Sequence, residues 1–219
     1  MSLEHYFLPF RNNVNGQNLS HKINGKALSI IYADWTASGR LYQPIEDYIN
    51  NKLGPYVANT HTETNLTGSA MTHAYHDAQS IIKRHVNACE NDILITAGAG
   101  MTAVINKFQR ILGLRIPERM QDQVSFAEND KPVVFITHME HHSNQTSWYE
   151  CDVTLEIVNP DEKGNPSKEH LIALLEQYRD RKVKIGSFTA CSNVTGIKTP
   201  YYQLAEIMHD YDGLCFVDF

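Results

Sequence analysis

The chain has 219 residues, of which 42% are hydrophobic and 20% are charged, a balance typical of a globular protein rather than a disordered one. Its 19 basic and 25 acidic side chains give a formal charge of −6, and they include no basic block. This charge argues against nucleic acid or an anionic membrane surface as the main partner.

The sequence shows none of the signals of an exported or membrane protein. The N-terminus has no basic region followed by an apolar core, and no apolar run reaches the length needed to span a membrane. The cysteines are far apart and form no C-x-x-C pair, so they indicate free thiols rather than a structural zinc site; they are Cys89, Cys151, Cys191 and Cys215. We therefore expect a cytoplasmic protein with no membrane partner.

The first part of the chain predicts helices joined by polar connections. Residues 1–27 are mostly polar, and a short β-rich run follows at Leu28–Tyr32. A helix opens at Pro44, because proline is tolerated in the first helical turn, and it ends before Gly54. A longer helix is expected over residues 70–88, where apolar side chains recur at i, i+3, i+4 spacing.

From residue 92 onward, strand-like and helix-like segments alternate. Strands are expected at Ile93–Thr96, Val133–Thr137, Val153–Ile157, Lys182–Ala190 and Leu214–Phe219. Helices are expected over Thr102–Leu112, after a capping Ser167 as far as Tyr178, and over Pro200–Tyr211. This alternation predicts an α/β fold with a mostly parallel sheet and helices on both faces.

The residues that could carry chemistry follow the ends of the expected strands. Gly98–Thr102 follows the first strand, His138–Asn144 the second and Cys191–Gly196 the fourth, and Asp218 ends the fifth. Ligands of parallel α/β sheets bind at the carboxyl ends of the strands. The sequence therefore predicts a ligand site at one edge of the sheet.

The stretch from Gly98 to Ala103 suggests an anion site. Unpaired N–H groups and the helix dipole attract a phosphate at a helix start, although an ordinary turn of small residues would look the same. The pattern also matches the relaxed dinucleotide fingerprint G-x-G-x-x-A, so a nicotinamide-dependent oxidoreductase is a second hypothesis. That fingerprint needs an acidic residue at the end of the second strand, which here ends in Thr137.

Three further positions suggest contacts to a ring-shaped ligand. His138, His141 and His142 with Glu140 could ligate zinc, but such ligand pairs need a helix and the apolar pattern there is not helical, so we predict no metal site. A flat aromatic base for a ligand ring is the alternative. Asn193 can offer an amide from a turn. A buried Asp218 needs a cationic partner, such as a protonated ring nitrogen.

Taken in order, these motifs resemble one family, the class V aminotransferases. This group of fold-type-I pyridoxal-phosphate enzymes includes the cysteine desulfurases and selenocysteine lyases. The matching motifs are Tyr32–Ala37, Ala97–Asn106, Met139–Asn144 with Trp148, Ser192–Gly196 and Phe216–Asp218. The resemblance implies an N-terminal segment at residues 1–31 and the pyridoxal-phosphate-binding large domain at residues 32–219.

The resemblance also implies a role for each site residue. Ala99, Gly100 and Thr102 would hold the phosphate of pyridoxal 5′-phosphate. His141 would stack on the pyridine ring, Asn193 would contact its hydroxyl and Asp218 would pair with its nitrogen, so His141 and Asp218 are the expected catalytic residues. Gly100-Met101 stands where cysteine desulfurases typically carry Thr-Glu, which makes Thr102 the candidate for the hydroxyl ligand.

The resemblance further implies a small amino-acid substrate and a homodimer when full length. The Schiff-base lysine of the family lies beyond the aspartate strand, so we expect this chain to be a fragment, with Lys107 and Lys198 as surface residues. The family places two later strands beside the first, so Ile93–Thr96 should lack its neighbours or pair with another chain. Because the lysine is absent, a non-catalytic structural or partner-binding domain is the third hypothesis.

Overall fold

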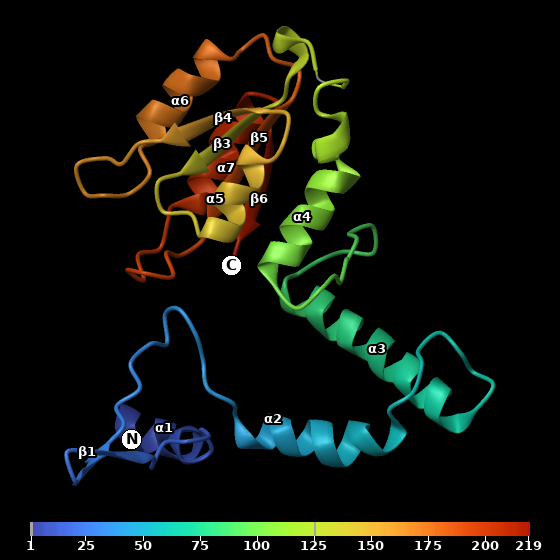
Figure 1. Cartoon of the computed structure of the whole chain (residues 1–219), viewed down its shortest axis with the longest axis vertical. Coiled ribbons are helices and arrows are strands. Elements are labelled where there is room, and N and C mark those ends of the chain that lie inside the picture. The colour runs from blue at the N-terminus through green and yellow to red at the C-terminus, as the bar shows by residue number, and fades with distance from the viewer. Residues whose placement is uncertain (1, 125) are drawn as a thin grey trace. The chain divides into compact units, whose positions relative to one another are not determined.

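The computed structural model describes residues 2–124 and 126–219, and it divides into two compact units, Met1–Ile95 and Thr96–Phe219 (Figure 1). Each unit is described by itself. The family boundary expected between residues 31 and 32 stays a prediction. Among the described residues, no helix combines the length and the apolar character that crossing a bilayer requires.

The first unit consists of helices and one small hairpin. Its helical segments are α1 (Leu3–Asn12), α2 (Gln43–Tyr48), the π-helical turn η1 (Ile49–Leu53), the 3-10 turn η2 (Gly54–Tyr56) and α3 (Leu66–His85). The helix expected from Pro44 is present, with a π-helical second half. The helix α1 was not expected; its start is capped by the Ser2 hydroxyl, which accepts a hydrogen bond from the His5 N–H.

The hairpin pairs β1 (Ser20–Ile23) with β2 (Lys26–Ser29) in antiparallel register. Asn24 and Gly25 connect them with φ angles of 50° and 80°. Positive φ at both central residues is what a two-residue hairpin turn requires, and Asn-Gly is the residue pair that best accepts it.

The second unit is built on a four-stranded parallel sheet in the order β4-β3-β5-β6 (Figure 1). The strands are β3 (Val133–Thr137), β4 (Thr154–Val158), β5 (Lys184–Thr189) and β6 (Leu214–Asp218). Every residue of β3 and β5 is buried, as expected for central strands covered on both faces. Because the strands are parallel, Thr137, Thr189 and Asp218 end at the same edge of the sheet.

Helices cover both faces of this sheet, which confirms the predicted α/β class. On one face, α6 (Lys168–Gln177) and α7 (Tyr201–Asp210) pack Leu175 and Met208 against alternate residues of β3. On the other face, α4 (Met101–Ile111) and α5 (His142–Tyr149) bring Ile105 and Trp148 to the intervening residues. The period of two along β3 divides its side chains between the two cores.

The prediction of a strand at Ile93–Thr96 is wrong for this structure. The run is extended but pairs with no strand among the described residues, and Ile93 is 85% exposed. An apolar run becomes a strand only when neighbouring strands take up its backbone N–H and C=O groups. Within the described residues no strand pairs with this run, and whether it pairs with another chain stays a prediction.

The helix α5 was also missed, because its buried face is polar rather than apolar. Asn144, Ser147 and Trp148 are its buried residues, and they lie three and four positions apart, as on one helical face. Hydrogen bonds, rather than a stripe of aliphatic side chains, fix this helix to the sheet. A search for hydrophobic periodicity cannot detect such a segment.

The packing of α6 gives a stability prediction. Leu175 is fully buried in the core beneath α6, so Leu175→Ala should lower the free energy of unfolding by about 2–5 kcal/mol. Ile172 on the same helix is 39% exposed, and Ile172→Ala should cost much less. Urea denaturation of both variants measures the difference; equal losses would contradict the assigned face of α6.

Candidate functional site

A buried carboxylate joins the ends of the two central strands. Glu140 Oε1 accepts hydrogen bonds from the Thr137 N–H at 3.1 Å, the Thr137 hydroxyl at 2.6 Å and the Thr189 N–H at 3.0 Å, and its Oε2 accepts from Asn144 Nδ2 at 2.7 Å. Burial raises the pKa of Glu140, and these donors partly oppose that rise. The side chain thereby holds the ends of β3 and β5 and the start of α5 together.

The amide of Asn144 anchors α5 to the sheet. Its Nδ2 also donates to the Ser187 carbonyl at 3.2 Å, while its Oδ1 accepts from the Ser187 hydroxyl at 2.7 Å and from Trp148 Nε1 at 3.0 Å. Two donors and two acceptors are thus satisfied in a buried position. Because the anchored residue lies three positions after His141, this network fixes where the histidine stands at the edge of the sheet.

His141 occupies the N-cap of α5, where its Nδ1 accepts a hydrogen bond from the Ser143 N–H. The Ser143 hydroxyl lies 3.0 Å from His141 Nδ1 and 2.6 Å from the Thr102 hydroxyl at the start of α4. Two predicted site residues, Thr102 and His141, are therefore linked through one serine. The helices that carry them pack on the same face of the sheet.

Asp218 lies at the end of β6, in register with Thr189. Burial raises the pKa of its carboxyl, and the positive charge that His141 can carry lowers it in part. Both catalytic candidates lie beyond or at strand ends on the same edge of the sheet. A half-buried carboxylate at this edge favours a cationic ligand group.

The start of α4 is shaped by glycine. Gly98 has φ +60°, and a Cβ there would collide with the Cβ of Ala103. Gly100 is the N-cap residue, and no side chain caps the helix. Ala99, Gly100 and Thr102 are exposed, so the first turn presents its backbone to solvent beside the Thr102 hydroxyl.

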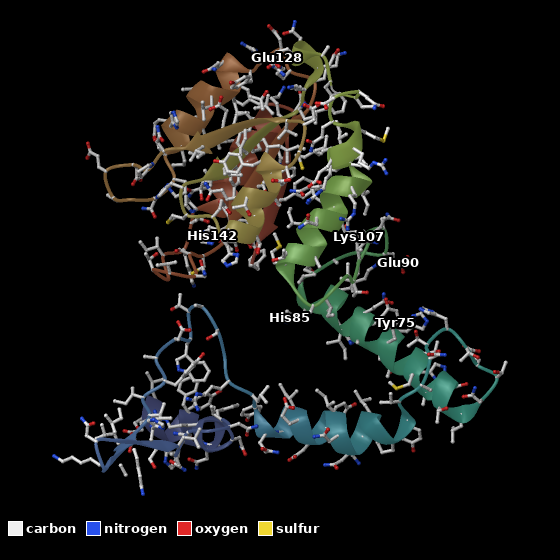
Figure 2. The ribbon with its side chains drawn as sticks, viewed as in Figure 1. Tyr75, His85, Glu90, Lys107, Glu128 and His142 are labelled. Carbon is white, nitrogen blue, oxygen red and sulfur yellow. The ribbon has the colours of Figure 1, made fainter. Side chains whose placement is uncertain are left out.

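The other predicted residues occupy separate positions. Asn193 is half-buried in the turn after β5, where the Ser192 hydroxyl accepts hydrogen bonds from the N–H groups of Val194 and Thr195. His138 Nε2 lies 3.1 Å from the Gly164 carbonyl, at a different loop. Among the described residues, no three His, Cys, Asp or Glu side chains are grouped to hold a metal ion. Lys107, on α4 in Figure 2, and Lys198 are exposed.

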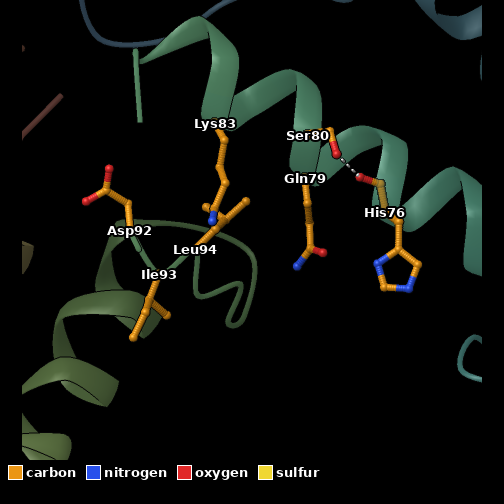
Figure 3. A pocket seen from close by; sticks show the side chains of 7 residues that line it. All are labelled: His76, Gln79, Ser80, Lys83, Asp92, Ile93 and Leu94. Carbon is orange, nitrogen blue, oxygen red and sulfur yellow. Dashed lines mark hydrogen bonds between the residues drawn. The ribbon is translucent and has the colours of Figure 1, made fainter. Parts of the chain in front are cut away.

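A separate hollow in the first unit contains none of the predicted site residues. It measures about 410 Å³ and lies between α3 and the extended run that was expected to be a strand (Figure 3). Its lining consists of His76, Gln79, Ser80, Lys83, Asp92, Ile93 and Leu94. The hollow therefore adds nothing to the edge-of-sheet site.

Comparison with known proteins decides the family. The family model described as aminotransferase class-V matches residues 31–219. The chain belongs to this family. This assignment confirms the predicted resemblance and favours it over the nicotinamide hypothesis.

The similar proteins are cysteine desulfurases. The chain is 26% identical over 204 residues to a probable cysteine desulfurase of Halalkalibacterium halodurans, covering 91% of this chain and 46% of that protein. It is 25% identical over 204 residues to a cysteine desulfurase of Synechococcus elongatus, covering 91% of this chain and 30% of that protein. The chain therefore spans less than half the length of these relatives.

Solved structures agree on the fold. An apo cysteine desulfurase from Thermococcus onnurineus superposes with a TM-score of 0.65 at 19% identity, covering 84% of this chain and 42% of that one. A NifS-like protein from Rickettsia africae gives a TM-score of 0.60 at 16% identity, covering 80% of this chain and 43% of that one. The fold is therefore that of fold-type-I enzymes.

Sequence reasoning named Glu140 only as a candidate metal ligand and gave Ser143 no role. The structure shows that both are structural links within the site. The signal that could have identified Glu140 is its place three residues after the end of β3, as the one acidic residue among His138, His141 and His142. No sequence signal identifies Ser143, because its partner Thr102 lies 41 residues away.

The burial of Glu140 predicts a pH dependence of stability. The pKa of Glu140 in the folded chain lies above its value of about 4.3 in the unfolded chain. The group therefore stabilises the folded state at low pH, and this stabilisation is lost as the pH rises from the unfolded pKa through the folded pKa. We expect the unfolding free energy of the wild type minus that of Glu140→Gln to fall with pH across this window. Urea denaturation at a series of pH values measures it.

Glu169 provides a control of opposite sign. Hydrogen bonds from its own backbone N–H and from Ser167 lower the pKa of its carboxyl. The unfolding free energy of the wild type minus that of Glu169→Gln should rise with pH, in the range below the pKa of Glu169 in the unfolded chain. If both differences change in the same direction, the account of Glu140 is wrong.

Proposed function

We propose that the chain is the cofactor-binding part of a pyridoxal-phosphate enzyme that acts on a small amino acid, as a cysteine desulfurase, a selenocysteine lyase or an aminotransferase. The observation that supports this is the convergence at one edge of the sheet of Asp218, at the end of β6, and His141, which Thr102 reaches through Ser143. This cofactor needs a carboxylate beside its ring nitrogen and an aromatic face against its ring. It also needs a hydroxyl beside free helix N–H groups for its phosphate.

The residues fit the two ends of pyridoxal phosphate. Ala99 and Gly100 offer backbone N–H groups at the start of α4, and Thr102 adds a hydroxyl, so this turn would bind the phosphate. The half-buried Asp218 would pair with the ring nitrogen. His141 would stack on the ring, and Asn193 would contact the ring hydroxyl.

Each side chain then has a defined task. When bound, pyridoxal phosphate withdraws electrons from the Cα of the amino-acid substrate. Asp218, when ionised, would pair with the positively charged ring nitrogen on which that withdrawal depends. His141, at a capped helix start, keeps a flat surface against the ring. Glu140 and Asn144 keep the strand ends and α5 in place.

A homodimer and a cytoplasmic location complete the proposal. The homodimer of the full-length protein comes from the resemblance to the family, in which the lysine and further substrate contacts lie outside the positions of this chain. The cytoplasmic location comes from the widely spaced cysteines, which indicate free thiols. Light scattering on the purified full-length protein tests the dimer: a mass of twice one full-length chain supports it, and a monomer under all conditions contradicts it.

The phosphate contact is tested with Thr102→Val. Loss of a hydrogen bond to a charged phosphate should weaken binding of pyridoxal 5′-phosphate about tenfold or more, measured by titration calorimetry. Binding of pyridoxal, which lacks the phosphate, should be unchanged. The control is Thr146→Val, whose hydroxyl bonds to its own helix at the His142 carbonyl. Equal effects of the two variants on pyridoxal phosphate would contradict the assignment.

The ring contact is tested with Asp218→Asn. A neutral amide cannot balance a positive ring nitrogen, so the affinity for both pyridoxal phosphate and pyridoxal should fall about tenfold. The two variants therefore separate the two ends of the cofactor. Saturable binding of NAD, with no binding of pyridoxal phosphate, would favour the nicotinamide hypothesis instead.

A further inference from the structure

Ser143 contacts two residues of the proposed site, Thr102 and His141, and has no role of its own in the proposed function. Its hydroxyl oxygen is 2.6 Å from Thr102 Oγ1 and 3.0 Å from His141 Nδ1. Its backbone N–H also donates to His141 Nδ1, at 3.2 Å. One residue of α5 thus contacts the ring of His141 twice and the start of α4 once.

The protons of this cluster can be assigned from chemistry. A backbone N–H is always a donor, so His141 Nδ1 must present its lone pair, and the proton of the neutral ring is on Nε2. The Ser143 hydroxyl then donates to Nδ1. Its oxygen is left to accept the proton of the Thr102 hydroxyl. The donor direction therefore runs from Thr102 through Ser143 to His141.

We infer that Ser143 is a positioning residue that holds His141 in the Nε2–H form and connects it to the phosphate-binding turn. The inference rests on the proposed function for the meaning of that turn. A phosphate that accepts the Thr102 proton removes the donor to Ser143, whose hydroxyl then turns toward Thr102. His141 Nδ1 keeps only the backbone N–H. Binding of phosphate at the turn thereby changes the hydrogen bonding of the His141 ring, although the phosphate does not contact that ring.

Other charged groups near His141 leave this assignment in place. Asp218 ends β6 at the same edge of the sheet, and the His142 ring centroid lies 5.9 Å from that of His141. The Glu140 carboxylate is engaged by Thr137, Asn144 and Thr189. Ser143 is thus the residue that the structure places on Nδ1.

The test is nitrogen-15 NMR of the His141 ring in the labelled full chain, at a mildly alkaline pH well above the pKa of free histidine. A His141→Gln variant assigns the signals. In the wild type, Nε2 should carry the proton. In Ser143→Ala the backbone N–H still donates to Nδ1, so the Nε2–H form should stay dominant. Loss of the hydroxyl hydrogen bond should raise the minor share of the Nδ1–H form about fivefold, and Ser143→Thr should restore the wild-type ratio.

Inorganic phosphate tests the connection. It should shift the Nδ1 signal in the wild type and in Ser143→Thr, but not in Ser143→Ala or in Thr102→Val. Unchanged backbone spectra away from α5 show that the variants remain folded. A proton on Nδ1 in the wild type, or the same tautomer ratio and phosphate response in Ser143→Ala, would overturn the inference.

The two proposals fail separately. Failure to bind pyridoxal phosphate, with the expected tautomer and phosphate response, overturns the proposed function and leaves the role of Ser143 intact. Normal cofactor binding with an unchanged spectrum in Ser143→Ala overturns the role of Ser143 alone.

Discussion

The carboxylate of Glu140 holds the strand ends around which the site is built. It accepts N–H groups from both β3 and β5 and from the amide of Asn144 on α5, so the consecutive segments β3 and α5 are joined to the end of β5, which is distant in sequence. A buried carboxylate is costly unless donors surround it, and this one has four hydrogen bonds. These hydrogen bonds fix the ends of β3 and β5 relative to each other, and so fix the positions of the side chains at the carboxyl edge of the sheet.

At this edge, polar contacts position the groups that the proposed cofactor would meet. His141 caps α5, Asp218 ends β6 beside Thr189, and Thr102 reaches His141 through Ser143. The site combines a half-buried negative charge at one strand end with exposed amides at the start of α4. The carboxylate favours a cationic group and the exposed amides favour an anionic group, so the site suits a ligand that is anionic at one end and cationic at the other.

Most of the second unit could be predicted from the sequence because its signals are local. The strand at Val133 is a run of apolar and β-branched residues, the strand at Lys184 carries Ile185 and Phe188 among small and polar residues, and Ser167 caps α6 as expected. Two predictions failed where the outcome depends on distant groups. Ile93–Thr96 has the composition of a strand but no strand beside it, and α5 buries hydrogen-bonded Asn144 and Trp148 instead of an apolar stripe.

The sequence by itself determined the fold class, the order of the motifs and the family, since hydrophobic period and residue order are properties of the chain alone. Only the tertiary structure decided which side chains meet. The contact of Ser143 with Thr102 joins residues 41 positions apart, and that of Glu140 with Thr189 joins residues 49 apart. No local pattern encodes such contacts, because they arise only when parallel strands bring their ends to the same edge.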